Sequence, residues 1–185
     1  EGIYLGNLGI VYHERGQHDL AVEYFTQAIQ IAREIGDKRG EGINLGNLGD
    51  TFVKIAQLDK AEDAFQKAIL INDQASPPAA GVFRGSLALL LAQQDQFDEA
   101  QTLLEIGEPQ VATYPLEHTK FLCKKGQVQL LADEPEAAQK ALDQAKAIAT
   151  EHKFGADSEV AQAIAELTAL LGSSDDPDDP AGEER

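Results

Sequence analysis

Apolar residues recur at helical spacing from the start of the chain. One face of the first predicted helix carries residues at i, i+3, i+4 and i+7, namely Leu5, Leu8, Gly9 and Tyr12. After a break, a second helix is predicted over residues 19–35. Its buried side is expected to consist of Ala21, Tyr24, Phe25, Ala28, Ile29 and Ala32. The pattern therefore predicts a hairpin of two helices.

This hairpin is repeated along the chain. The segment EGIYLGNLG at residues 1–9 returns as EGINLGNLG at residues 41–49, so one 40-residue unit is duplicated head to tail. The apolar spacing continues beyond residue 80 if the register slips slightly from unit to unit. We expect one repeat domain over residues 1–171, because stacked hairpins bury a continuous core that none could bury alone. Its units are predicted at residues 2–41, 42–78, 79–115 and 116–153.

A last amphipathic helix is predicted over residues 157–171. Its apolar stripe consists of Val160, Ile164, Leu167 and Leu171. No partner helix follows it, so we expect a cap whose outer face is kept in water by Glu159, Gln162 and Glu166. Residues 172–185 hold six acidic residues and no large apolar one. Such a composition is typical of a disordered acidic tail.

Charge and composition narrow the possible partners. The 185 residues include 32 acidic and 15 basic ones, a formal net charge of −17 at pH 7, which disfavours nucleic acid and anionic membranes as partners. Apolar runs such as residues 87–92 are far shorter than the roughly 20 residues that cross a bilayer. Cys123 is the only cysteine, which fits a reducing, cytoplasmic compartment. Methionine is absent even at position 1, so we expect an excerpt of a larger protein.

Signals for catalysis or for a cofactor are weak. The glycines near the N-terminus follow no predicted strand and lack the spacing of a phosphate-binding turn. The histidines show no metal-ligand spacing and have no cysteine paired with them; they are His13, His18, His118 and His152. We interpret Cys123 as a buried structural thiol. The sequence therefore predicts neither an enzyme nor a bound cofactor or metal.

The repeated residues resemble the tetratricopeptide repeat. The positions that match its signature are Leu8-Gly9 and Tyr12 on the first helix and Ala21, Phe25 and Ala28 on the second. The family's Trp is replaced by Leu5 and Leu45, and the unit exceeds the common length of about 34 residues. Long units of this kind are similar to those of kinesin light chains and of the spindle-orientation proteins named for a Leu-Gly-Asn motif. The resemblance implies an all-α, right-handed superhelical solenoid of antiparallel helix pairs.

The resemblance also implies a binding surface. In this family the first helices of successive units line a concave groove that receives a peptide or a helix of a partner protein. The candidate residues are Asn7, Ile10, Glu14, Asn47, Asp50, Lys54, Ser86, Leu89, Gln93 and Lys124. An Asn amide can donate to and accept from a peptide backbone at once. An alternative interpretation is that Asn7 and Asn47 brace neighbouring repeats through local hydrogen bonds. Lys124 belongs to a basic cluster, with Lys120 and Lys125, that fits an acidic partner or a solvated face.

These observations lead to two hypotheses about function. The first is a non-catalytic module that binds a partner protein in the concave groove. The alternative is an oligomerisation or scaffold segment that regulates a neighbouring catalytic or signalling domain. Self-association is a further expectation, because the outer face of the first helix is left uncovered and can pair with a second copy. The identity of the partner does not follow from the repeat pattern.

Overall fold

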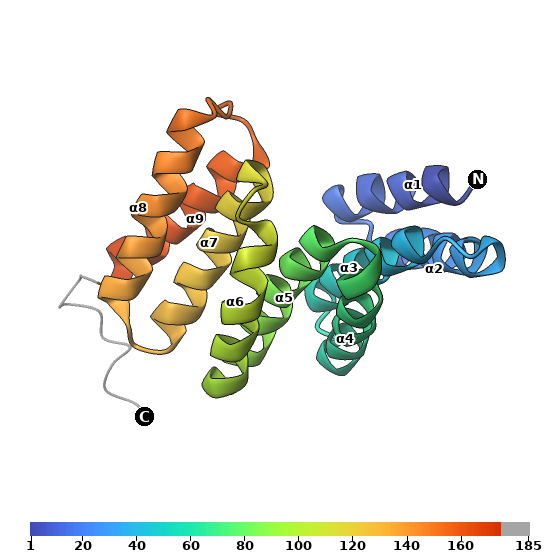
Figure 1. The fold of residues 1–185 in the computed structure, drawn as a ribbon, viewed down its shortest axis with the longest axis horizontal. Helices are drawn as coiled ribbons and strands as arrows, with labels where there is room; N and C mark the ends of the chain where they lie inside the picture. Colours follow the sequence, from blue (N-terminus) through green and yellow to red (C-terminus); the bar gives the residue numbers. More distant parts are fainter. Residues whose placement is uncertain (175–185) are drawn as a thin grey trace.

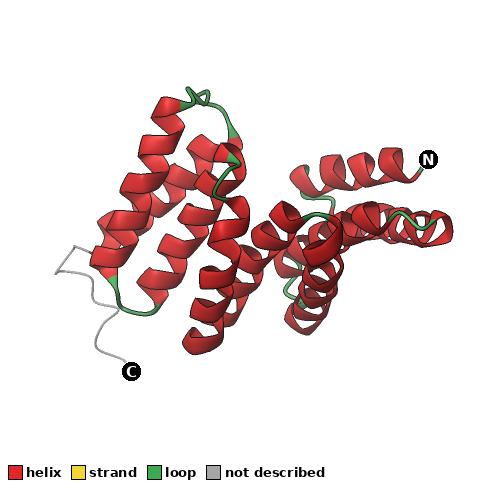
Figure 2. Cartoon of the chain, in the orientation of Figure 1, coloured by secondary structure: helices red, strands yellow, loops and turns green. Residues whose placement is uncertain are grey.

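The structure, a computed structural model, describes residues 1–174 as helices joined by short loops (Figure 1; Figure 2). Within these residues there are nine helices and no strand. The helices are α1 (Gly2–Glu14), α2 (His18–Ile35), α3 (Lys38–Lys54), α4 (Leu58–Ala75), α5 (Pro77–Ala92), α6 (Phe97–Val111), α7 (Pro115–Leu131), α8 (Pro135–Glu151) and α9 (Glu159–Ser174). The prediction of an all-α helical repeat solenoid is confirmed.

Consecutive helices pair as hairpins that stack along the molecule. The pairs are α1 with α2, α3 with α4, α5 with α6 and α7 with α8, and α9 packs against α7 and α8 (Figure 1). Helix α3 begins at Lys38, before the predicted unit boundary at residue 42, because the Asp37 carboxylate accepts a hydrogen bond from the Gly40 backbone N–H at 2.8 Å. Helix α9 continues past residue 171 to Ser174. The rest of the predicted acidic tail, residues 175–185, lies outside the described residues.

Glycines let the two helices of a hairpin approach closely. A Cβ atom added to Gly9 would lie 2.6 Å from the ring of Phe25, and one added to Gly49 would lie 2.7 Å from the ring of Phe65. Both rings are almost completely buried. A glycine inside a helix costs about 1 kcal/mol relative to alanine. Close packing of an aromatic ring against each glycine offsets this cost.

A second set of glycines lies where the first helix of one unit meets the first helix of the next. The contacting pairs are Asn44 with Gly6, Phe83 with Gly46 and Phe121 with Gly85. The first junction differs from the other two in chemistry, because an amide takes the place of an aromatic ring. The Asn44 side-chain nitrogen donates to the carbonyl of Gly40 at 2.8 Å, so this buried amide is partly satisfied within its own helix.

The apolar core has two parts that meet at α7. The larger part runs through the first three hairpins and includes Phe121 and Val128 from one side of α7. The smaller part lies between α7, α8 and α9 and includes Leu122, Leu142 and Leu167. Adjacent residues Phe121 and Leu122 therefore belong to different clusters. Helix α7 joins the last hairpin to the rest of the stack.

One residue of the predicted buried stripe is exposed. Leu8 is 40% exposed, whereas Leu48, which lies 40 residues later, is 8% exposed. Helix α3 is covered by α2 of the preceding hairpin. Helix α1 has no equivalent neighbour among the described residues. The prediction that Leu8 is buried is therefore wrong, because burial at this position depends on the unit in front.

Candidate functional site

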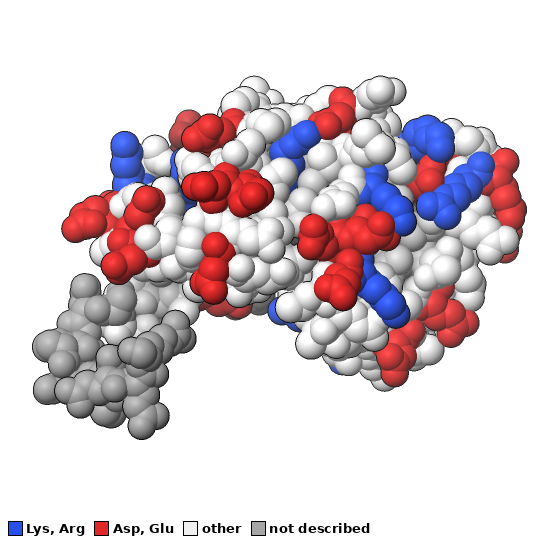
Figure 3. Space-filling model, turned by 90° about the horizontal axis from the view of Figure 1, so that it is seen from below, with Lys and Arg blue, Asp and Glu red and all other residues white. Residues whose placement is uncertain are grey.

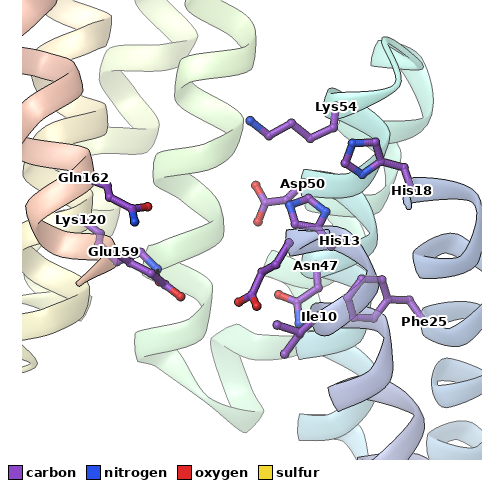
Figure 4. A pocket seen from close by; sticks show the side chains of 11 residues that line it. Ile10, His13, His18, Phe25, Asn47, Asp50, Lys54, Lys120, Glu159 and Gln162 are labelled. Carbon is purple, nitrogen blue, oxygen red and sulfur yellow. Dashed lines mark hydrogen bonds and ion pairs between the residues drawn. The ribbon is translucent and has the colours of Figure 1, made fainter. Parts of the chain in front are cut away.

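The first helices of the hairpins line a hollow side of the stack, and α9 stands at its far edge. The largest cavity there has a volume of about 740 Å³. Its lining residues are Ile10, His13 and Glu14 of α1, His18 and Phe25 of α2, Asn47, Asp50 and Lys54 of α3, Lys120 of α7, and Glu159 and Gln162 of α9. Figure 4 shows Lys120, Glu159 and Gln162 facing Asn47 and Asp50 across the cavity.

Two further cavities continue this hollow along the stack. One of about 430 Å³ extends over α3, α5, α7 and α9, and another of about 220 Å³ lies between α3, α5 and α7. Asp50 and Lys120 line all three cavities. We call the combined surface of the three cavities the groove. It brings together residues from hairpins that are far apart in the sequence.

All the candidate residues from the sequence except one line the groove. These are Ile10, Glu14, Asn47, Asp50, Lys54, Ser86, Leu89, Gln93 and Lys124. Asn7 lies on the exposed surface of α1 and lines none of the three cavities. Equivalent positions in successive units therefore converge on one surface, but the first unit contributes only part of its set.

Asn47 lines two of the three cavities that form the groove. Among the hydrogen bonds of residues 1–174, none involves the side-chain amide of Asn47 or of Asn7. The Asn side chain that braces two units is Asn44, which packs against Gly6. The amide of Asn47 thus keeps its donors and its acceptor available at the groove surface.

The ammonium group of Lys124 is a cation whose position is fixed by a contact between two helices. Its ammonium group donates to the hydroxyl oxygen of Ser86 at 2.5 Å, a contact between α7 and α5. Removal from water lowers the pKa of Lys124, and the nearby carboxylate of Asp50 opposes that shift. The other two lysines of the basic cluster form ion pairs, Lys120 with Glu159 and Lys125 with Glu108. The cluster is therefore partly neutralised by acidic neighbours.

Two groove histidines were not among the sequence candidates. The Nδ1 atom of His13 lies 3.0 Å from the hydroxyl oxygen of Thr51, which links the first hairpin to the second. Burial lowers the pKa of His13, and the carboxylate of Asp50 partly opposes this effect. His18 packs edge-on against His13 with ring centroids 5.5 Å apart. The sequence spacing could have identified His13 as a groove residue, because it follows Ile10 by three residues and so shares a helix face with it.

Helix α9 contributes residues that were expected to face water at the end of the array. Glu159 and Gln162 line the largest cavity, and Glu166 lines the second one. The Lys120 ammonium group lowers the pKa of Glu159. The periodicity of α9 indicated which side of the helix is apolar. It did not indicate that the polar side would form a wall of the groove.

Charge is mixed in the groove and over the visible surface. Lys54 and Lys124 share the groove with Asp50, Glu14 and Glu166. Figure 3 shows acidic and basic side chains interspersed over the face that it displays. No helix within residues 1–174 is long and apolar enough to cross a bilayer. The same residues contain no group of acidic, histidine or cysteine side chains that could hold a metal ion.

Solved structures share this architecture. BtubC (BKLC) from P. vanneervenii superposes with a TM-score of 0.65 at 19% identity, covering 85% of this chain and 67% of that chain. A putative kinesin light chain from Podosopora anserina with nearly identical TPR-like repeats gives a TM-score of 0.61 at 16% identity, covering 92% of each chain. Its Q17M variant gives 0.63 at 16% identity, covering 92% of this chain and 86% of that chain. At these identities the likeness shows the fold alone.

Sequence profiles identify the repeat itself. A tetratricopeptide repeat profile matches residues 2–72, and a second profile of the same repeat matches residues 81–105. No curated protein sequence matches the chain. The profile matches cover the duplicated hairpins and most of the third unit, and the similar structures extend the fold over the remainder. The chain therefore belongs to the tetratricopeptide repeat family, with repeats that resemble those of kinesin light chains.

Proposed function

We propose that this chain is a non-catalytic protein-interaction module that holds a peptide or a helix of a partner protein in the groove. The observation that carries the proposal is the convergence of α1, α3, α5, α7 and α9 on one hollow surface. A repeat array creates such extended concave surfaces as a consequence of its curvature. Tetratricopeptide repeats are generally interaction scaffolds, which agrees with this use of the fold.

The polar groups of the groove suit a polypeptide ligand. Asn47 offers an unengaged amide, and Lys54 and Asp50 offer opposite charges a turn apart on α3. A peptide backbone presents alternating donors and acceptors, and its side chains carry both signs of charge. Nucleic acid fits less well, because the carboxylates of the groove and the net charge of −17 repel phosphates.

The chemistry of the groove supports a role without catalysis. Burial raises the pKa of the Cys123 thiol to about 11, and the carboxylate of Glu166 adds to this effect. A thiol with such a pKa stays protonated at neutral pH and is a poor nucleophile. The Thr51 hydroxyl is hydrogen-bonded to His13, and it donates its own hydrogen to the backbone carbonyl of Asn47 at 2.8 Å. Because that hydrogen is not directed at His13, the Thr51 hydroxyl is not poised as a nucleophile.

Selection from a displayed library of random peptides tests this proposal. Peptides that bind the intact chain are measured by calorimetry against Asn47→Ala and Lys124→Ala. We expect each variant to weaken binding by about tenfold or more, the effect of removing a central contact. Gln66→Ala is the matched control, because this exposed amide on α4 bonds to Glu62 away from the groove.

Two outcomes contradict the proposal. Selected peptides that bind the groove variants as tightly as the intact chain place the binding surface elsewhere. A library that yields no binder above the level of an unrelated helical protein argues against peptide recognition by this chain. Circular dichroism of each variant ensures that a lost interaction is not a lost fold.

A further inference from the structure

The hydrogen bonds around His13 fix which of its ring nitrogens carries the proton. The Thr51 hydroxyl donates its one hydrogen to the backbone carbonyl of Asn47. Its oxygen can therefore only accept from His13, whose Nδ1 atom lies 3.0 Å away. Neutral His13 thus carries its hydrogen on Nδ1 and has a lone pair on Nε2.

The Nε2 atom of His13 is open to the groove. The side chain of His13 lines two of the three cavities. Within residues 1–174, Nε2 forms no hydrogen bond, and it is not one of the unpaired polar atoms that are shut off from solvent. His13 therefore presents a hydrogen-bond acceptor to a ligand in the groove, and such a position takes an N–H or O–H donor.

The charged groups around His13 make this part of the groove negative. The ring is influenced by Asp50 and Lys54 of α3, His18 of α2 and Glu14 of its own helix. Figure 4 shows His13 and Asp50 next to each other on the side of the cavity that α1 and α3 form. Among these groups two carboxylates stand against one ammonium group. No ion pair within residues 1–174 engages the carboxylate of Asp50 or of Glu14.

The other lysines of the groove are engaged elsewhere. The ammonium group of Lys124 lies near enough to Asp50 to be influenced by it, but it donates to the Ser86 hydroxyl. Lys120 forms its ion pair with Glu159. Asp50 lines all three cavities, so its carboxylate remains accessible to a ligand along the whole groove.

On the basis of the proposed function, we infer that the groove binds a basic segment of the partner, with a lysine or arginine side chain held between Nε2 of His13 and the carboxylate of Asp50. Ammonium and guanidinium groups donate hydrogen bonds and accept none, so they suit two neighbouring acceptors. The net charge of −17 attracts such a segment from a distance.

Protonation of His13 reverses the chemistry of this position. Because Nδ1 already carries a hydrogen, the added proton goes to Nε2, which becomes a donor on a cation beside Asp50. This cation competes with the partner's basic side chain for the same carboxylate. Burial lowers the pKa of His13, and Asp50 opposes that shift, so the change occurs below about pH 6.5. The partner is therefore held at neutral pH and released in acid.

Selection of random peptides on the intact chain at pH 7.5 tests this inference. We expect lysine or arginine to be enriched in the selected peptides. In calorimetry with the tightest peptide, replacing its basic residue with glutamine should weaken binding by about tenfold or more. Asp50→Asn should weaken the unchanged peptide to a similar degree, and both changes together should cost little more than either alone. Asp63→Asn is the matched control, because this carboxylate of α4 pairs with Lys67 and lines no groove cavity.

The pH dependence of binding tests the role of His13. Between pH 7.5 and 5.5 the affinity of the intact chain for the selected peptide should fall, although the basic residue of the peptide keeps its charge over this range. His13→Gln should reduce this fall, because glutamine does not titrate. His152→Gln is the control, since His152 is exposed and lies outside the groove. An equal fall in the intact chain and in His13→Gln overturns the assignment to His13.

The outcomes separate this inference from the proposed function. Peptides whose binding is weakened by Asn47→Ala but not by Asp50→Asn overturn the inference and leave groove binding intact. Enrichment of acidic residues in place of basic ones has the same meaning. Failure to select any peptide overturns both. Circular dichroism of every variant checks that the fold is retained.

Discussion

At the scale of single residues, the stack depends on glycines that face aromatic rings. Phe83 fills the space that Gly46 leaves, and Phe121 does the same at Gly85. The residue types at these positions are therefore coupled in pairs across units. A larger side chain at either position of a pair would displace the residue at the other position, since packed interiors leave little free volume.

Gly46→Ala is expected to lower the free energy of unfolding by about 1–3 kcal/mol, because the added methyl group overlaps the ring of Phe83. Urea denaturation followed by circular dichroism measures this loss. Gly172→Ala is the control, since no atom lies within 4 Å of a Cβ added there and alanine favours a helix by up to about 1 kcal/mol. Equal losses in the two variants would show that packing against Phe83 is not the cause.

His13 is expected to make stability depend on pH. Its pKa is lowered in the folded chain by burial, so below about pH 6.5 the unfolded chain binds a proton that the folded chain does not. The stabilising contribution is complete above the pKa of the unfolded state and is lost as pH falls toward the folded value. Between pH 7.5 and 5.5 the intact chain should therefore lose more free energy of unfolding than His13→Gln. Identical pH dependence of the two chains would contradict this assignment.

At the scale of elements, most helices were predictable from the sequence and the position of α9 was not. Repeated residues such as Gly9 and Phe25 fix how two helices of a hairpin pack, because they are local in sequence. The apolar stripe of α9 indicates that one side is buried, but it does not identify the surface that it meets. Glu159 and Gln162 line the groove because α9 packs on α7, a contact that no sequence period records.

The attachment of α9 is expected to depend on burial rather than on its ion pair. Leu167 is fully buried, so Leu167→Ala should cost about 2–5 kcal/mol of the free energy of unfolding. Glu159→Gln removes an ion pair to Lys120 whose acidic side chain is 64% exposed, so it should cost less than about 1 kcal/mol. Thermal or urea unfolding compares the two. A larger loss for Glu159→Gln would reverse this ranking.

At the scale of the whole molecule, the two core clusters divide the stack. Among the helices that the structure describes, only α7 belongs to both, through Phe121 on one side and Leu122 on the other. In a repeat protein, stability is approximately a sum of units and of contacts between neighbours. A destabilising substitution in the last hairpin is therefore expected to have only a weak effect on the stability of the first two hairpins.

Hydrogen exchange of Leu167→Ala tests this division. Backbone amides of α8 and α9 are expected to exchange much faster than in the intact chain, whereas those of α1 to α4 should change little. The physical reason is that the smaller cluster loses contacts directly and the larger one does not contain Leu167. A uniform increase along the chain would show that the array unfolds as one cooperative unit.

The largest cavity places α1 and α9, the first and last described helices, on the rim of a single opening. Every junction between hairpins adds a small rotation, and these rotations accumulate at that opening. Small changes in the packing angle at the junctions therefore add up to a larger change in the distance between α1 and α9. These junctions contain Gly6, Gly46 and Gly85. A polypeptide that contacts both α1 and α9 would fix the distance between them and would thereby set the superhelical pitch of the repeat array.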